Sequence, residues 1–167
     1  MIQIFLNPYE TLFQKSTTWT SADKIDGYDD IEKFEQDMIK LMKNAYGLGL
    51  AANQIGITKR FFAIGHNTFD TFKKSAIIWN PLIKKYSKEK VFDVEGCLSF
   101  PGIFVKVERP KQIEVQYETT QGKTRTAKLD GMESKCFQHE LDHLEGITFN
   151  KRISKLRWDM AKKKALN

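Results

Sequence analysis

The stretch CFQHELDH, from Cys136 to His143, places two histidines four residues apart with a glutamate directly after the first. On an α-helix this spacing directs the imidazoles of His139 and His143 to one face, so that both can bind one metal ion. Glu140 lies beside them, where a carboxylate can take a proton from a water molecule at that ion. The segment therefore predicts a metal-binding helix with a general acid/base. The rest of the chain must supply the third ligand.

Cys97 is the candidate for that ligand, because two histidines and one water leave a tetrahedral site one ligand short. It lies in EGCLSFPG, where Gly96 and Pro101 favour a bend around the thiol. A nearby dication would hold the sulfur as a thiolate. A buried cysteine is more often a small core residue, so this segment by itself leaves both interpretations open.

A third distinctive segment, GLGLAANQIG, runs from Gly47 to Gly56. It is too rich in glycine for a helix interior and too apolar for an ordinary surface loop. Its small residues let another backbone approach closely, and Gln54 is its one long polar side chain, able to donate an amide hydrogen bond. A tight packing loop with an incidental glutamine is the alternative.

In this order, GLGLAANQ, EGCLS and QHELDH resemble the three signature motifs of the peptide deformylase family, over Gly47 to about Asn150. That family removes the formyl group from the N-terminal methionine of nascent chains and releases formate. The resemblance also implies site residues. The metal would be held by Cys97, His139 and His143, the general acid/base would be Glu140, the formyl oxygen would receive hydrogen bonds from Gln54 and the backbone N–H of Leu98, and the substrate would lie along the backbone of Gly49.

The resemblance implies iron(II) as the metal in cells, although a thiolate with two imidazoles also suits zinc, nickel or cobalt. It further implies an apolar pocket for the methionine side chain beside the metal helix. Cys136 and Met132 fall on a helix face that could line this pocket or simply belong to the core. The chain departs from the family pattern at Glu133, Ser134 and Lys135, where this helix is commonly apolar. We therefore expect a more polar pocket rim.

The 167 residues suit one catalytic domain, spanning 1–167, since no repeat or linker divides them. Apolar periodicity predicts a helix from Ile31 to Ala45, capped by Asp29, the metal helix of about sixteen residues from 130, and a short helix over 153–165. Strands are expected at 60–65, at 76–87 with Pro81 marking an edge or a bend, and as a hairpin over 111–129. The resulting class is α+β, with mostly antiparallel sheets around the central metal-binding helix.

The net charge of +6 resides in the last seventeen residues, which carry seven Lys or Arg and one Asp. Residues 150–167 thus read as a basic C-terminal helix that could contact ribosomal RNA phosphates or simply be solvated. Many bacterial family members carry a longer helix here, and this short form is similar to the minimal forms found in phages. The chain shows no secretory signal or membrane span, and its two cysteines do not suggest a disulfide, so we expect a cytoplasmic monomer.

Two other function classes remain open. Zinc endopeptidases share the His-Glu-x-x-His motif, but they usually take their third ligand downstream, and no His or Cys follows His143 here. A basic RNA- or ribosome-binding module with a structural zinc would need a closed site of four ligands, and three are available. A deformylase that kept its metal and lost activity is a further possibility, although no candidate catalytic position is replaced.

Overall fold

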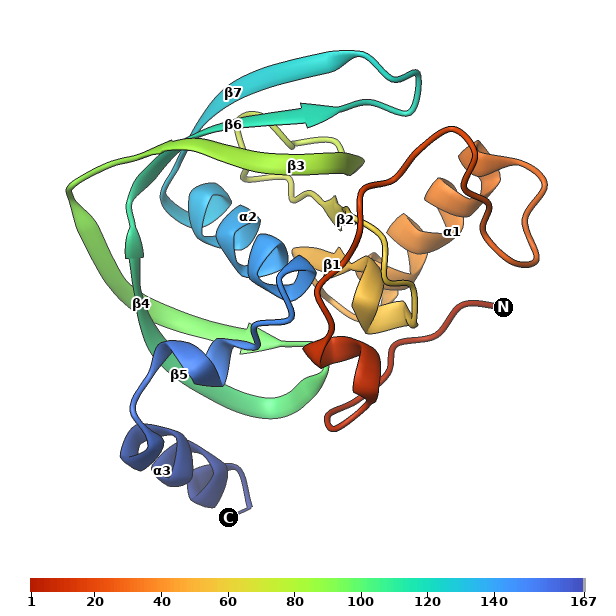
Figure 1. Ribbon diagram of the computed structural model, residues 1–167. Helices are drawn as coiled ribbons and strands as arrows, with labels where there is room; N and C mark the ends of the chain where they lie inside the picture. The colour runs from red at the N-terminus through yellow and green to blue at the C-terminus, as the bar shows by residue number, and fades with distance from the viewer. Residues whose placement is uncertain (167) are drawn as a thin grey trace.

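The computed structural model describes residues 1–166 of the chain (Figure 1). This part of the chain contains three α-helices, seven strands and three short 3-10 helices. In chain order the elements are η1 (Glu10–Phe13), α1 (Ile31–Asn44), β1 (Gly49–Ala51), η2 (Ala52–Ile55), β2 (Phe61–Ile64), β3 (Ala76–Tyr86), β4 (Lys90–Cys97), β5 (Phe100–Pro110), β6 (Gln112–Glu118), β7 (Thr124–Asp130), α2 (Gly131–Leu144), η3 (Phe149–Arg152) and α3 (Lys155–Ala165).

Five strands form one sheet in the order β1-β2-β3-β6-β7, and every neighbouring pair is antiparallel. Successive side chains of a strand point to opposite faces, so β2 serves two cores. Phe62 packs in the cluster that contains Phe137 of α2, whereas Phe61 packs in the cluster that contains Phe34 of α1. The helices therefore cover opposite faces of the sheet, which confirms the predicted α+β class.

Strands β4 and β5 pair with each other in a separate antiparallel sheet. Figure 1 shows α2 lying between this two-stranded sheet and the five-stranded one. Phe100 and Val107 of β5 pack with Phe149 and with Trp158 of α3, which holds the C-terminal helix against β5. The metal helix of the sequence prediction is thus central, and both sheets contribute to its surroundings.

Pro81 lies just beyond the end of β2, because β3 pairs with β2 only from Ala76 to Trp79, whereas β6 pairs with it on the other side as far as Tyr86. The register with β6 shifts between Trp79 and Leu82, and Asn80 has a φ of 47°. The shift takes the proline out of the regular hydrogen-bond ladder, where its missing N–H would otherwise leave a gap. Pro81 therefore marks a bend, at the point where β3 loses one of its two strand partners, in agreement with the predicted edge or bend.

Helix α2 is mostly buried, although eight of its fourteen residues are polar or charged. Glu133 is 5% exposed and accepts hydrogen bonds from the backbone N–H groups of Thr71 and Phe72. Ser134 is fully buried and its hydroxyl accepts a hydrogen bond from Gln138. The expectation that Glu133 and Ser134 lie at a pocket rim is therefore wrong, since their side chains stabilise a loop and the helix itself.

The predicted helix over 31–45 is confirmed, but its cap is Asp30, whose carboxylate accepts the N–H of Glu32, and not Asp29. The predicted hairpin over 111–129 is also confirmed, because β6 and β7 pair antiparallel, and Ile113 and Val115 of β6 are buried. Among residues 1–166, no helix has the length and apolar character that a bilayer span requires.

Candidate active site

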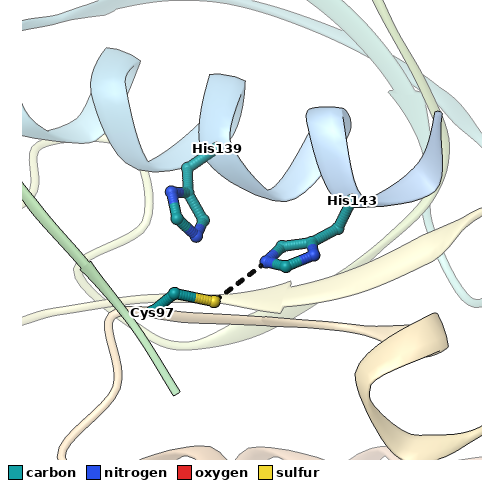
Figure 2. A group of neighbouring side chains, drawn as sticks. All are labelled: Cys97, His139 and His143. Atoms are coloured by element: carbon teal, nitrogen blue, oxygen red, sulfur yellow. Dashed lines mark hydrogen bonds between the residues drawn. The ribbon is translucent and has the colours of Figure 1, made fainter. Parts of the chain in front are cut away.

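Cys97, His139 and His143 meet between α2 and the end of β4 (Figure 2). One potential ligand atom from each of them lies within 4.8 Å of the other two. The Sγ of Cys97 is 3.3 Å from Nε2 of His143. One sulfur and two imidazole nitrogens, nearly enclosed by protein, form a donor set that fits a tetrahedral transition-metal ion with one position left for water or substrate.

Glu95 orients the first histidine. Its Oε2 is 2.9 Å from Nδ1 of His139. This contact leaves the other ring nitrogen, Nε2, for the ligand group, that is, the three potential ligand atoms of Cys97, His139 and His143. Burial opposes the charge on Glu95, but hydrogen bonds from His139 and Arg109 outweigh it and lower the pKa of this carboxyl to about 2. Burial also opposes charge on His139, yet Cys97 and Glu95 raise its pKa well above the usual value. The site thus attracts positive charge, which a bound cation would supply in place of the proton.

The second histidine lies in a drier environment. Burial lowers the pKa of His143 well below its usual value, and the neighbouring His139 lowers it further. Its ring therefore stays neutral, which is the form that binds a metal. The amide of Asn53 donates to the backbone carbonyl of His143 and so ties the end of α2 to the segment after β1.

A buried chain of charges continues from Glu95. Arg109 of β5 binds both carboxylate oxygens of Glu95 and donates to Oδ2 of Asp142 at 2.9 Å. Arg152 in turn binds both oxygens of Asp142. This network joins β4, β5, α2 and η3 behind the histidines. Sequence reasoning missed it, although Glu95 and Asp142 lie inside two of the motifs.

Glu140 is 4% exposed, and its Oε2 finds no hydrogen-bond partner among residues 1–166. Gly49 makes room for it: a Cβ at that position would lie 2.5 Å from Oε1 of Glu140. Burial is the main cause that raises the pKa of Glu140 to about 7. A carboxyl group with such a pKa can exchange protons efficiently at neutral pH.

Gln54 is 1% exposed and held at both ends of its amide. Its Oε1 accepts the N–H of Ala51 at 2.9 Å, while its Nε2 donates to Oγ of Ser99 at 3.1 Å and lies 3.6 Å from Sγ of Cys97. The amide donor therefore points toward the ligand group. Ser99, which sequence reasoning also missed, fixes this orientation. Leu98 lies between Cys97 and Ser99 in the turn that joins β4 to β5.

A cavity of about 540 Å³ opens beside these residues. Met132 is 49% exposed at its edge, and Cys136 is buried. Burial raises the pKa of the Cys136 thiol, so this group stays neutral. Lys135 also lines the cavity, as the expected polar rim requires. Of the predicted site residues, the cavity walls include Gly49, Gln54, Cys97, Leu98, Met132, Cys136, His139 and Glu140.

Residues 1–158 match the family model described as polypeptide deformylase. The chain belongs to this family. The peptide deformylase of Wolbachia sp. subsp. Brugia malayi is 41% identical over 156 residues, which cover 87% of each chain. The peptide deformylase structure from Thermotoga maritima superposes with a TM-score of 0.81 at 36% identity, covering 92% of this chain and 98% of that one.

A probable peptide deformylase from Synechococcus phage S-SSM7 is 37% identical, with a TM-score of 0.79, and covers 92% of this chain and 100% of its own. The comparisons confirm the predicted family, its fold and its activity as a metallohydrolase that removes the N-formyl group from nascent polypeptides. They argue against both the zinc endopeptidase and the RNA-binding module. The roles of single residues stay predictions.

Gly49→Ala should lower formate release about 100-fold, because the new methyl group displaces the Glu140 carboxylate. The free energy of unfolding should fall by only about 1 to 3 kcal/mol. The control is Gly122→Ala, which strains a φ of +73° but meets no atom of residues 1–166 within 4 Å. This control variant should lose a similar free energy of unfolding and release formate at the wild-type rate. Equal activity in both variants would contradict this role of Gly49.

Arg109→Met should lower the free energy of unfolding by about 3 to 5 kcal/mol, because it leaves the buried carboxylates of Glu95 and Asp142 without their shared partner. Urea denaturation measures the loss. The control is Lys90→Met on the same two-stranded sheet, whose ion pair with Glu108 is exposed and should contribute less than about 1 kcal/mol. Comparable losses in both variants would refute the structural role of the buried network.

Proposed function

We propose that Cys97, His139 and His143 hold one divalent cation, at which the formamide bond of N-formylmethionyl peptides is hydrolysed. The observation that carries this proposal is the grouping of their ligand atoms beside Glu140, whose Oε2 is buried and unpaired among residues 1–166. When bound, such a cation would favour ionisation of water and polarise the formyl carbonyl. The donor set suits iron, zinc, nickel or cobalt, and we propose iron(II) in cells on the resemblance of the motifs.

Glu140 would act as the general acid/base. Its carboxylate accepts a proton from the attacking water and then donates it to the nitrogen of the leaving amine. Two features of the structure support both steps by one group. The pKa of Glu140 is raised to about 7, and the absence of a side chain at Gly49 leaves room for its carboxylate. Glu140 is also buried, so that bulk water has little access to its carboxylate.

Gln54 and Leu98 would stabilise the charge that develops on the formyl oxygen. Nε2 of Gln54 is held toward Cys97 by Ser99, so that this donor needs no reorganisation during the reaction. The backbone N–H of Leu98 would be the second donor. Preformed donors of this kind typically contribute about 3 to 4 kcal/mol each to transition-state stabilisation.

The substrate would enter the cavity with its first side chain toward α2. Cys136 and Met132 would line the pocket for the methionine side chain, and the backbone beside Gly49 would bind the peptide. We further propose that the chain acts as a monomeric, single catalytic domain in the cytoplasm, where ribosomes present its substrate. The packing of Trp158 against Phe100 supports one domain that includes α3.

The test is formate release from formyl-Met-Ala-Ser by anaerobically purified protein loaded with iron or nickel. Chelation of the metal should abolish release, and reloading should restore it. Glu140→Gln should keep one ion per chain and release formate about 100 to 10,000 times more slowly. His143→Ala should lose both the bound ion and formate release. Full activity of the Glu140 variant, or activity that survives chelation, would overturn the proposed mechanism.

Helix α3 is a candidate contact to ribosomal RNA. Its exposed lysines give a positive surface, and Lys163 and Lys164 form no ion pair with any of residues 1–166. Deletion of the helix would be a poor test, because Trp158 covers Phe149 and Arg157 stacks on the Phe92 ring. Charge removal at the exposed lysines leaves this packing in place.

The double variant Lys163→Ala/Lys164→Ala should bind ribosomes more weakly than the wild type. The slope of log affinity against log salt should fall by about 1.5, as expected when two phosphate contacts are lost. Sedimentation with ribosomes at several KCl concentrations measures this slope. The matched control is Lys73→Ala/Lys74→Ala, which removes an exposed lysine pair in the loop that precedes β3. An equal effect of both double variants would contradict a specific role of α3.

A further inference from the structure

Among residues 1–166, Lys135 is the one lysine or arginine that lines the cavity, and its side chain is largely buried. Its side chain is 14% exposed, and its Nζ donates to Oδ2 of Asp93 at 2.7 Å and to the carbonyl of Val94 at 2.9 Å. Lysines are rarely buried unless they are paired. Two acceptors therefore hold this ammonium in a defined place instead of letting it extend into solvent.

The position of Lys135 on α2 places it in the pocket that the proposed function assigns to the first side chain. It lies one turn before His139, so the two side chains share a helix face. Met132 precedes it by three residues, and Cys136 follows it; all four line the cavity. The methylene stem of Lys135 is thus part of the pocket wall, beside a metal ligand of the proposed site.

The contacts of the Lys135 ammonium with Asp93 and Val94 form a tether between two walls of the cavity. Lys135 belongs to α2, whereas Asp93 and Val94 belong to β4, so the ion pair joins the helix to the two-stranded sheet. Hydrogen bonding to Lys135 is the largest cause that lowers the pKa of Asp93, so this carboxylate stays charged at neutral pH. The pair is therefore neutral as a whole, and the wall offers a donor without a net charge.

We propose that Lys135 determines which first side chain the enzyme accepts; this inference rests on the proposed function. An ammonium has three N–H donors, and Asp93 and Val94 engage two of them. The third can meet an acceptor atom near the end of a substrate side chain. The pocket accordingly selects an unbranched side chain with such an acceptor over a hydrocarbon of equal length. A sulfoxide oxygen is a strong acceptor and a thioether sulfur a weak one.

Asp93 has a separate part in this selectivity. Because Asp93 neutralises Lys135, a carboxylate on the substrate side chain meets no net positive charge, and one hydrogen bond from the ammonium does not offset the free energy of its desolvation. Without the Asp93 charge, the ammonium would attract that carboxylate. The two members of the pair thus make opposite contributions: Lys135 admits acceptor atoms, and Asp93 excludes anionic side chains.

The experiment measures kcat/KM for formate release from formyl-X-Ala-Ser peptides, with methionine, norleucine, methionine sulfoxide or glutamate as X. Norleucine replaces the thioether sulfur by a methylene, and the sulfoxide adds an acceptor oxygen. In Lys135→Met, kcat/KM for the sulfoxide peptide divided by kcat/KM for the norleucine peptide should fall about tenfold relative to the wild type. This change should lie mainly in KM. In Asp93→Asn the glutamate peptide should gain about tenfold relative to the methionine peptide.

The matched control is Lys59→Met, which removes an ion pair with Asp23 of the same 2.7 Å length outside the cavity. Its substrate ratios should equal those of the wild type. Unchanged ratios in Lys135→Met and Asp93→Asn, or an equal loss with all four peptides, would overturn the inference and leave the pair as a structural tether. Failure of the wild type to release formate from any peptide would overturn the proposed function, and this inference with it.

Discussion

The carboxylate of Glu95 sits between the ring of His139 and the guanidinium of Arg109, and the arrangement of the site depends on it. One oxygen fixes the direction of an imidazole, and both oxygens satisfy a buried cation. Arg109 also donates a hydrogen bond to Asp142, which precedes His143 on α2, and so fixes the helix near the second histidine. The two histidines are therefore positioned from outside the ligand group, by charges that can be buried only together.

A helix with so many buried polar side chains would be unstable by itself, because each unpaired group costs free energy. In α2 most of them are satisfied by other segments: Glu133 by the loop at 71–72, Asp142 by Arg109 and Arg152, and His139 by Glu95. Oε2 of Glu140 and Nδ1 of His143 are the exceptions on this helix, since neither atom has a hydrogen-bond partner among residues 1–166. Both atoms belong to residues that the proposed chemistry would use.

Strand β1 and the following 3-10 helix η2 complete the surroundings of Glu140 and Cys97. Gly49 provides the space that Glu140 occupies, and Gln54 turns its amide toward Cys97 under the control of Ser99. Lys135 lies on the same face of α2 as His139, a proposed metal ligand, and its ammonium is held by β4. Both sheets and the helix thus contribute to a single cavity.

Local patterns in the sequence determined the elements that depend on near neighbours. The helical spacing of His139 and His143, the alternation in β6 and the three ordered motifs required no knowledge of distant contacts, and they were sufficient for the α+β class and the family. Only the tertiary structure decided that β3 loses its β2 partner just before Pro81, that Glu133 supports a loop while Lys135 lines the cavity, and that Glu95 and Arg109 join behind the histidines. These features depend on residues far apart in the chain, whose partners are set by packing and not by local periodicity.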